Sequence, residues 1–221
     1  MPDIACSAAS GSKGGDSMGT QLLQALRILK HPVTGFWELR YENKAGIVTT
    51  LLMIFAAYFV TLGSELTTSY IFYPVENKFV DPFVIFIKIV VPFATWVVAN
   101  YLVSSIMRGQ GRLIDVLNGS AYALMPYILF TMPLAIVSNG LTLSEAAIYS
   151  FCRAVIYGWC AFLFFVSVRE VHNYEMGETA LNIFLSILFM LAIWILLVIF
   201  TGLTGQLFDF INQIWEEVSI R

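Results

Sequence analysis

Long runs of residues without charge are the feature that most constrains this chain. Five runs contain at most one charged residue each, and they cover 45–64, 89–107, 116–144, 146–168 and 179–208. Each run is close to the ~20 apolar residues that an α-helix needs to cross a ~30 Å hydrocarbon core. Inside a bilayer every backbone amide must be paired within the protein, so such runs favour membrane-spanning helices.

The composition agrees with a membrane location, because only 12% of the 221 residues are charged and 58% are hydrophobic. A soluble domain carries roughly 25% charge. The alternating pattern of an outer-membrane β-barrel is missing. We therefore predict an all-α integral membrane bundle of five transmembrane helices, near 46–64, 83–107, 116–138, 146–168 and 180–203.

Lys and Arg residues predict the orientation of this bundle. Eight of them fall on the side of the N-terminus: Lys13, Arg27, Lys30, Arg40, Lys44, Arg108, Arg112 and Arg169. Only Lys78 and Arg221 fall on the other side, while Lys88 and Arg153 lie within predicted spans. The positive-inside rule then predicts a cytoplasmic N-terminus and a C-terminus outside. In a bacterium the protein would lie in the inner, or plasma, membrane.

The parts of the chain outside the spans divide into three segments. Residues 1–18 predict a disordered tail without the apolar region of a signal peptide, and the true start is either Met1 or Met18. Residues 19–44 predict a cytoplasmic amphipathic, interfacial segment whose first helix ends at His31-Pro32. After a five-span domain over 45–205, residues 206–221 predict an amphipathic helix on the outer side. Either end helix could instead pack on the bundle or on a partner.

Two cations inside the predicted spans require an explanation. At 1.5 Å per residue, Lys88 lies about 9 Å and Arg153 about 11 Å below the outer ends of their helices. Glu65 ends the first span on the same side. We expect an outer-leaflet cluster of Glu65, Lys88 and Arg153, which serves either for structural pairing and snorkelling or as part of a path for a ligand or ion.

Small residues and prolines predict how the spans pack. A ladder of small residues four apart favours close helix contact, within one chain or between two, and it comprises Ala146, Ser150, Ala154 and Gly158. Gly119 and Ala123 have the same spacing. Prolines are expected to kink their helices, for packing or for a transport site, at Pro92, Pro126 and Pro133.

A compact polar stretch, MRGQGRLIDVLNGSAYALMP (107–126), joins the second and third predicted spans. Gly109 and Gly111 would allow a sharp turn with positive φ. Arg112 would hold this loop on the cytoplasmic side. Asp115 would cap the first turn of the following helix. The stretch therefore predicts a tight turn by which the chain re-enters the membrane.

Motifs of common enzymes are missing from the sequence. There is no HExxH, GxSxG, P-loop or CxxC pattern, and no pair of aspartates inside the spans. His172 lies in the polar stretch VREVHNYEMGET, where we expect a solvated side chain. We expect no enzyme activity, no catalytic, cofactor-binding or metal site, and no nucleic-acid partner.

Three stretches together resemble a bacterial-type member of the Yip family: ILKHPVTGFWELRYENKAG, RGQGRLIDVLNGSAYALMPYIL and VHNYEMGETALNI. The resemblance covers about residues 26–215, with five spans and a cytoplasmic N-terminus. That family takes its name from eukaryotic membrane proteins that interact with Ypt/Rab GTPases. The long acidic and aromatic N-terminal region of those relatives has no counterpart here, so we do not expect a Rab-type partner.

The resemblance also implies a candidate docking site and a function. Its characteristic positions, with Arg112 added, lie on the cytoplasmic side and are Gly109, Gly111, Arg112, Asp115, Tyr122, Pro126, His172, Asn173 and Tyr174. We expect a non-enzymatic scaffold or accessory subunit in membrane organisation or trafficking. It would be embedded in the lipid bilayer, with a cytoplasmic protein partner or as a homo-oligomer. The alternative is a transporter component or lipid-moving protein with a polar path near Lys88 and Arg153.

Overall fold

The computed structural model describes residues 18–41, 46–69, 72 and 80–219, with side chains described from 24 to 215 within those ranges. No strand lies among these residues, which confirms the predicted all-α fold. The helices are α1 (Met18–Lys30), α2 (Pro32–Tyr41), α3 (Ile47–Thr67), α4 (Pro82–Ile106), α5 (Leu113–Ala123), α6 (Met125–Val137), η2 (Ser138–Gly140), η3 (Leu143–Glu145), α7 (Ala146–His172) and α8 (Met176–Ser219). The predicted tail, apart from Met18, lies outside the described residues.

Five helical segments are long and apolar enough to cross a membrane, which confirms the predicted number of spans. They are Ile47–Thr67, Pro82–Ile106, Leu113–Gly140, Leu143–His172 and Met176–Trp215. The third segment combines α5, α6 and η2, and the fourth combines η3 and α7. The chain is therefore an integral membrane protein.

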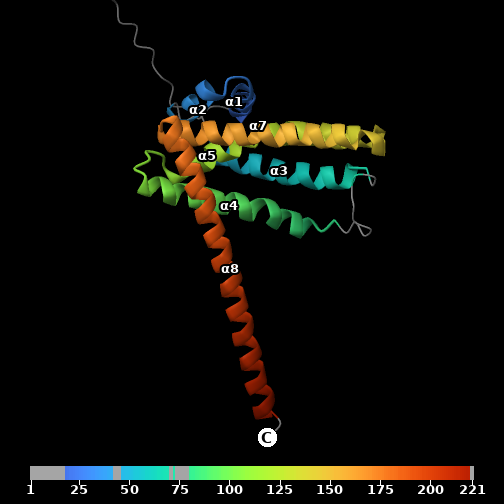
Figure 1. Cartoon of the computed structure of the whole chain (residues 1–221), viewed down its shortest axis with the longest axis vertical. Coiled ribbons are helices and arrows are strands. Elements are labelled where there is room, and N and C mark those ends of the chain that lie inside the picture. The colour runs from blue at the N-terminus through green and yellow to red at the C-terminus, as the bar shows by residue number, and fades with distance from the viewer. Residues whose placement is uncertain (1–17, 42–45, 70–71, 73–79, 220–221) are drawn as a thin grey trace, which may run out of the picture.

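The bundle has three nearly parallel helices, α3, α4 and α7, and α8 crosses them steeply (Figure 1). α6 packs on α3 and α7, while α5 contacts α3, α4 and α7. Two ends can be distinguished by their connections. The 107–112 end carries the loop between α4 and α5 and the turn between α7 and α8. The 138–145 end carries the connection between α6 and α7.

The third predicted span is divided into two helices at Leu124. Pro126 stands in the first turn of α6 and has no N–H with which to continue the helical hydrogen bonding. The N–H of Leu124 instead donates to the carbonyl of Ala121 at 3.2 Å, which ends α5. Pro92 and Pro133 stand inside continuous helices. Of the three prolines, only Pro126 interrupts its helix.

α8 is one continuous helix, so the predicted last span and the predicted C-terminal helix (206–221) are not separated. No proline lies between Met176 and Ser219, and glycine alone costs a helix only about 1 kcal/mol per residue. The first part of α8 packs on α4, where Trp194 Nε1 donates to Thr95 Oγ1 at 3.2 Å. The large apolar side chains of the part after Trp194 are exposed.

α1 and α2 form a helical pair that packs on the bundle. α1 ends two residues before Pro32, as predicted. Arg27 Nη1 lies 2.9 Å from Glu38 Oε2, which joins the two helices. Arg40 Nη1 donates to the carbonyl of Glu170 at 2.9 Å, and this bond ties α2 to the end of α7. The α1–α2 pair therefore packs on the bundle, and its interfacial location stays a prediction.

The small-residue ladder of α7 does not pack against another helix of this chain. Ser150, Ala154 and Gly158 are exposed, and a Cβ at Gly158 would meet nothing within 4 Å. The close contact is made on another face, where a Cβ at Gly119 of α5 would clash with Ser167 of α7. The predicted contact within one chain is therefore wrong for the ladder, while a contact between two chains stays a prediction.

Candidate functional site

The 107–112 loop turns through Arg108 and not through its glycines. Arg108 has a φ of 58°, whereas no glycine of the described ranges has a positive φ, so that prediction for Gly109 and Gly111 is wrong. The glycines are required for close approach. A Cβ on Gly109 would lie 2.5 Å from the Tyr174 hydroxyl, and a Cβ on Gly111 would lie 2.8 Å from His172 Nδ1. A side chain at either position would push the loop away from the end of α7.

His172 belongs to a buried hydrogen-bond network that is centred on Asn100, so the expected solvated histidine is wrong. Its side chain is 1% exposed, and its Nε2 lies 3.1 Å from Asn100 Oδ1 of α4. Asn100 Nδ2 donates to Asn182 Oδ1 at 2.8 Å and to Ser186 Oγ at 3.2 Å, both on α8. Because buried hydrogen bonds are strengthened by the low local dielectric, this network holds α4, α7 and α8 together.

The same network assigns the proton of the His172 ring. Asn100 donates through Nδ2, so its Oδ1 must accept, and His172 Nε2 must donate. In the neutral ring Nδ1 therefore holds a lone pair. That nitrogen is buried without a hydrogen-bond partner in the described part of the chain. A Cβ on Gly109 would lie 2.8 Å from it, as would one on Gly111, so the glycines seal this side of the ring.

Two tyrosines of the predicted docking site are also buried. The rings of Tyr174 and His172 stack with centroids 5.3 Å apart, and burial raises the pKa of the Tyr174 phenol. Its hydroxyl donates to the carbonyl of Ser104 at 3.4 Å. Tyr122 is fully buried in the apolar core, as is Pro126. These residues build the interior of the bundle and are not available to a partner.

Arg112 and Asn173 are the exposed members of the predicted docking site. Asn173 has a φ of 56° and ends α7 in the left-handed conformation that Asn tolerates. Asp115 is half-buried, and its carboxylate accepts the backbone N–H of Arg112 at 3.0 Å, which confirms the predicted cap of α5. The nine predicted residues therefore divide into four buried residues, an exposed pair, and three half-buried residues, Gly109, Gly111 and Asp115.

Sequence reasoning missed three members of the network: Asn100, Asn182 and Ser186. Both asparagines lie within runs that contain no charge. A polar amide in the hydrocarbon region needs an internal partner, so each asparagine was a usable signal. The sequence does not reveal that the two amides meet, because 82 positions separate them.

The structure brings Glu65, Lys88 and Arg153 to one pocket toward the 138–145 end. This charged pocket encloses about 270 Å³ between α3, α4, α6 and α7. Arg153 Nη2 donates to the Tyr157 hydroxyl at 3.3 Å. Across the described ranges, no ion pair joins the three charges. The expected cluster is thus a shared pocket without direct pairing, and its role stays a prediction.

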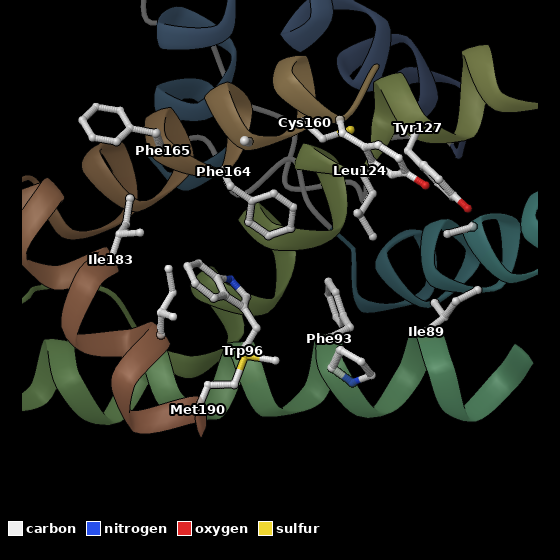
Figure 2. Close-up of a pocket in the computed structure, with 15 residues that line it drawn as sticks. Ile89, Phe93, Trp96, Leu124, Tyr127, Cys160, Phe164, Phe165, Ile183 and Met190 are labelled. Carbon is white, nitrogen blue, oxygen red and sulfur yellow. The ribbon is translucent and has the colours of Figure 1, made fainter. Parts of the chain in front are cut away.

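An apolar cavity of about 580 Å³ adjoins the charged pocket. It lies between α4 and α7 and is bounded on one side by α8 (Figure 2). Phe93, Trp96 and Phe164 line its middle, Met190 comes from α8, and Tyr127 lies at the end away from α8. The indole Nε1 of Trp96 donates to Ser120 Oγ at 3.2 Å, so the one polar atom of this ring is already hydrogen-bonded. The ring therefore contributes an apolar surface to the cavity.

The arrangement supports binding chemistry. His172 is hydrogen-bonded to an amide and not to a hydroxyl or thiol, so the ring is not placed to activate a nucleophile. Where the structure describes the chain, no three side chains of His, Cys, Asp or Glu gather to hold a metal ion. The charged pocket and the apolar cavity are two features that offer charge and room to a ligand.

In a comparison with protein families, the model of the Yip1 domain matches residues 26–199. The matched range contains the 107–112 loop, the end of α7, the charged pocket and the packed part of α8. It covers well over half of the 221 residues. No curated protein and no solved structure matches the chain.

Proposed function

Because the chain belongs to the Yip1 domain family, we propose that it is a non-enzymatic membrane protein that serves as a scaffold or accessory subunit. Its N-terminus would lie in the cytoplasm, and a protein partner would bind there at the 107–112 end. The observation that carries the proposal is the fixed surface that the two connections form at this end. We call this surface the loop face, and its exposed residues are Arg108, Gln110, Arg112, Asn173 and Glu175.

The buried network holds the loop face in place against the bundle. Gly109 and Gly111 contact the ring of His172, and His172 is bonded through Asn100 to α8. The two connections are therefore held at one place relative to the bundle, and little conformational entropy remains to be lost when a partner binds. Of these exposed residues, Arg108 and Arg112 offer contacts to acidic residues of a partner, and Glu175 offers a contact to a basic one.

The loop face is tested by purifying the tagged chain from its native membrane in mild detergent and measuring which protein accompanies it in stoichiometric amount. We expect one constant partner, and we expect Arg112→Glu to lower its amount about tenfold, since reversing a charge at an interface costs more than about 1.4 kcal/mol. Lys30→Glu reverses an exposed cation on α1 and is the control, which should retain the partner. Loss of the partner with both variants would contradict a site at the loop face.

His172 variants address the network and not the surface. His172→Ala is expected to weaken partner binding and to lower the unfolding temperature together, because the side chain is buried. Arg112→Glu should weaken binding alone. The loss of partner binding with Arg112→Glu is therefore assigned to docking only if this variant unfolds at the same temperature as the unchanged protein.

A second candidate function, as a transporter component or lipid-moving protein, is favoured by the pocket that gathers Glu65, Lys88 and Arg153. Polar groups at membrane depth often mark a substrate path. The measurement is movement of a fluorescent phospholipid between the leaflets of vesicles that contain the purified protein. Movement that is lost with Arg153→Leu would support this function, whereas movement equal to that of protein-free vesicles would exclude it for lipids.

A further inference from the structure

The charged pocket and the apolar cavity are two parts of one amphipathic site. They share three lining residues, Ile89, Tyr127 and Tyr157. Polar groups stand at this junction: the hydroxyls of Tyr127 and Thr61 are 2.7 Å apart, and Tyr157 accepts from Arg153 at 3.3 Å. A ligand that extends across the junction would therefore have a polar part and an apolar part.

The charged part attracts an anion. Lys88 and Arg153 bring two positive charges to the pocket, and Glu65 brings one negative charge. Neither cation forms an ion pair with a carboxylate anywhere in the described ranges. A cation below the membrane surface is costly without a counter-charge or water. An anionic group between Lys88 and Arg153 would supply that counter-charge.

The apolar part has the length and direction of one leaflet. The lining runs from Ile89 to Trp96 on α4 and from Tyr157 to Phe165 on α7. At 1.5 Å per residue these stretches are about 10–12 Å long, close to half of a ~30 Å hydrocarbon core. They lead away from the 138–145 end, as the acyl chains of a lipid lead away from its headgroup.

We propose that this site binds one glycerophospholipid, with its phosphate between Lys88 and Arg153 and one acyl chain in the cavity beside Phe93, Trp96 and Phe164. The occupant comes from the bilayer itself, because the cavity adjoins helices whose outer faces are apolar. This inference goes beyond the docking function, since it concerns what the bundle binds and not what binds the loop face. If the second candidate function is correct, a glycerophospholipid would be its substrate. The binding proposal itself does not require lipid to move between the leaflets.

Photolabelling in vesicles without phosphate tests the proposal. The protein is placed in vesicles of digalactosyl diacylglycerol that contain a small amount of one of two tracers. One tracer is phosphatidylethanolamine with a diazirine on one acyl chain, and the other is diacylglycerol with the same diazirine chain. We expect the phospholipid to label the peptides that contain Phe93, Trp96 and Phe164 about tenfold more than the diacylglycerol does, because a charge-assisted contact to the phosphate is lost in the latter. Equal labelling by both tracers would overturn the proposal.

Two pairs of variants separate the charged part from the apolar part. Arg153→Leu removes the cation at the pocket and should lower phospholipid labelling about tenfold. Lys30→Leu removes an exposed cation elsewhere and should not change it. Ala161→Phe places a ring in the cavity that Ala161 lines, and should also lower the labelling. Ala147→Phe places the same ring on an exposed part of α7 outside the cavity and should leave it unchanged.

The outcomes distinguish this site from the proposed functions. Labelling that is insensitive to both Arg153→Leu and Ala161→Phe would show that lipid contacts the helices without a site, and the proposal would fall. Absence of labelling in the cavity would mean that another helix or a second copy fills it, and would also overturn the proposal. Neither result would affect partner docking, which is read by co-purification. Phospholipid labelling without movement between leaflets would remove only the second candidate function.

Discussion

The two ends of the bundle bury polar groups in opposite ways. At the 107–112 end, Asn100, His172 and Asn182 are almost fully buried and bonded to one another. Toward the 138–145 end, Lys88 and Arg153 remain exposed in a pocket and have no carboxylate partner among the described residues. The first end uses buried polar groups to join helices, and the second has two cations without an ion-pair partner.

Three glycines near the 107–112 end are closely packed. Gly109, Gly111 and Gly119 lie at places where a Cβ would clash with α7 or with the turn that follows it. Gly158, in the middle of α7, and Gly177, at the start of α8, have open space around them, whereas a Cβ on Gly63 of α3 would clash with Met132 of α6. Close packing supports a network that needs fixed distances, whereas open packing leaves volume for a ligand. The comparison therefore predicts stability effects at the first end and binding effects at the second.

Gly111→Val is expected to have the largest effect on stability. The new side chain would begin 2.8 Å from His172 Nδ1 and 2.6 Å from Val171 Cγ1, and overpacking of this kind costs about 1–3 kcal/mol or more. The measurement is the thermal unfolding midpoint of the purified protein in detergent. Gly177→Ala is the matched control, because a Cβ there meets nothing within 4 Å. A loss of equal size with both variants would contradict close packing of the loop.

Asn100→Leu is expected to have the next largest effect, a loss of about 1–3 kcal/mol, since the partners of a buried amide are left without hydrogen bonds. Asn212→Leu replaces an exposed asparagine of α8 and should change stability by less than about 0.5 kcal/mol. A double variant of Asn100 and Asn182 tests the coupling. If the two residues act in one network, the combined loss is smaller than the sum of the single losses. Additive losses would argue against the network.

Ala154→Leu is expected to have the smallest effect, within about 0.5 kcal/mol, because this residue of the ladder is exposed. Ala123→Leu makes the same change at a position that is 0% exposed and should destabilise the protein strongly. The thermal unfolding midpoints of the two variants compare an exposed position with a closely packed one. A large loss for Ala154→Leu, with a change in native mass, would reveal a contact between two copies.

The sequence predicted the spans well because their signal is local. A run without charge is visible in consecutive residues, and so is the proline that divides the third span. The burial of His172 was not predictable in this way, because its neighbours Glu170, Asn173 and Glu175 are polar and suggest a solvated loop. The ring is buried because the loop glycines and Asn100, far away in sequence, cover it together with Tyr174.

The charged pocket was predictable in part from the sequence. Glu65, Lys88 and Arg153 were predicted to cluster from their depth in the membrane alone, and they do line one pocket. The position of a residue along its span gives its depth in the bilayer. Three charged residues at similar depth come together when their helices are rotated so that these side chains face one another. The adjoining apolar cavity was not predictable, since it depends on the angle at which α8 leaves the bundle.

The length of α8 is connected with its steep crossing of α4. Its apolar segment has 40 residues, and at 1.5 Å per residue it is about 60 Å long, twice a ~30 Å hydrocarbon core. A straight helix of that length stays within the core only when it tilts about 60° from the membrane normal. The length of α8 thus requires an inclined helix in such a bilayer, while its packing on α4 fixes the direction of the incline.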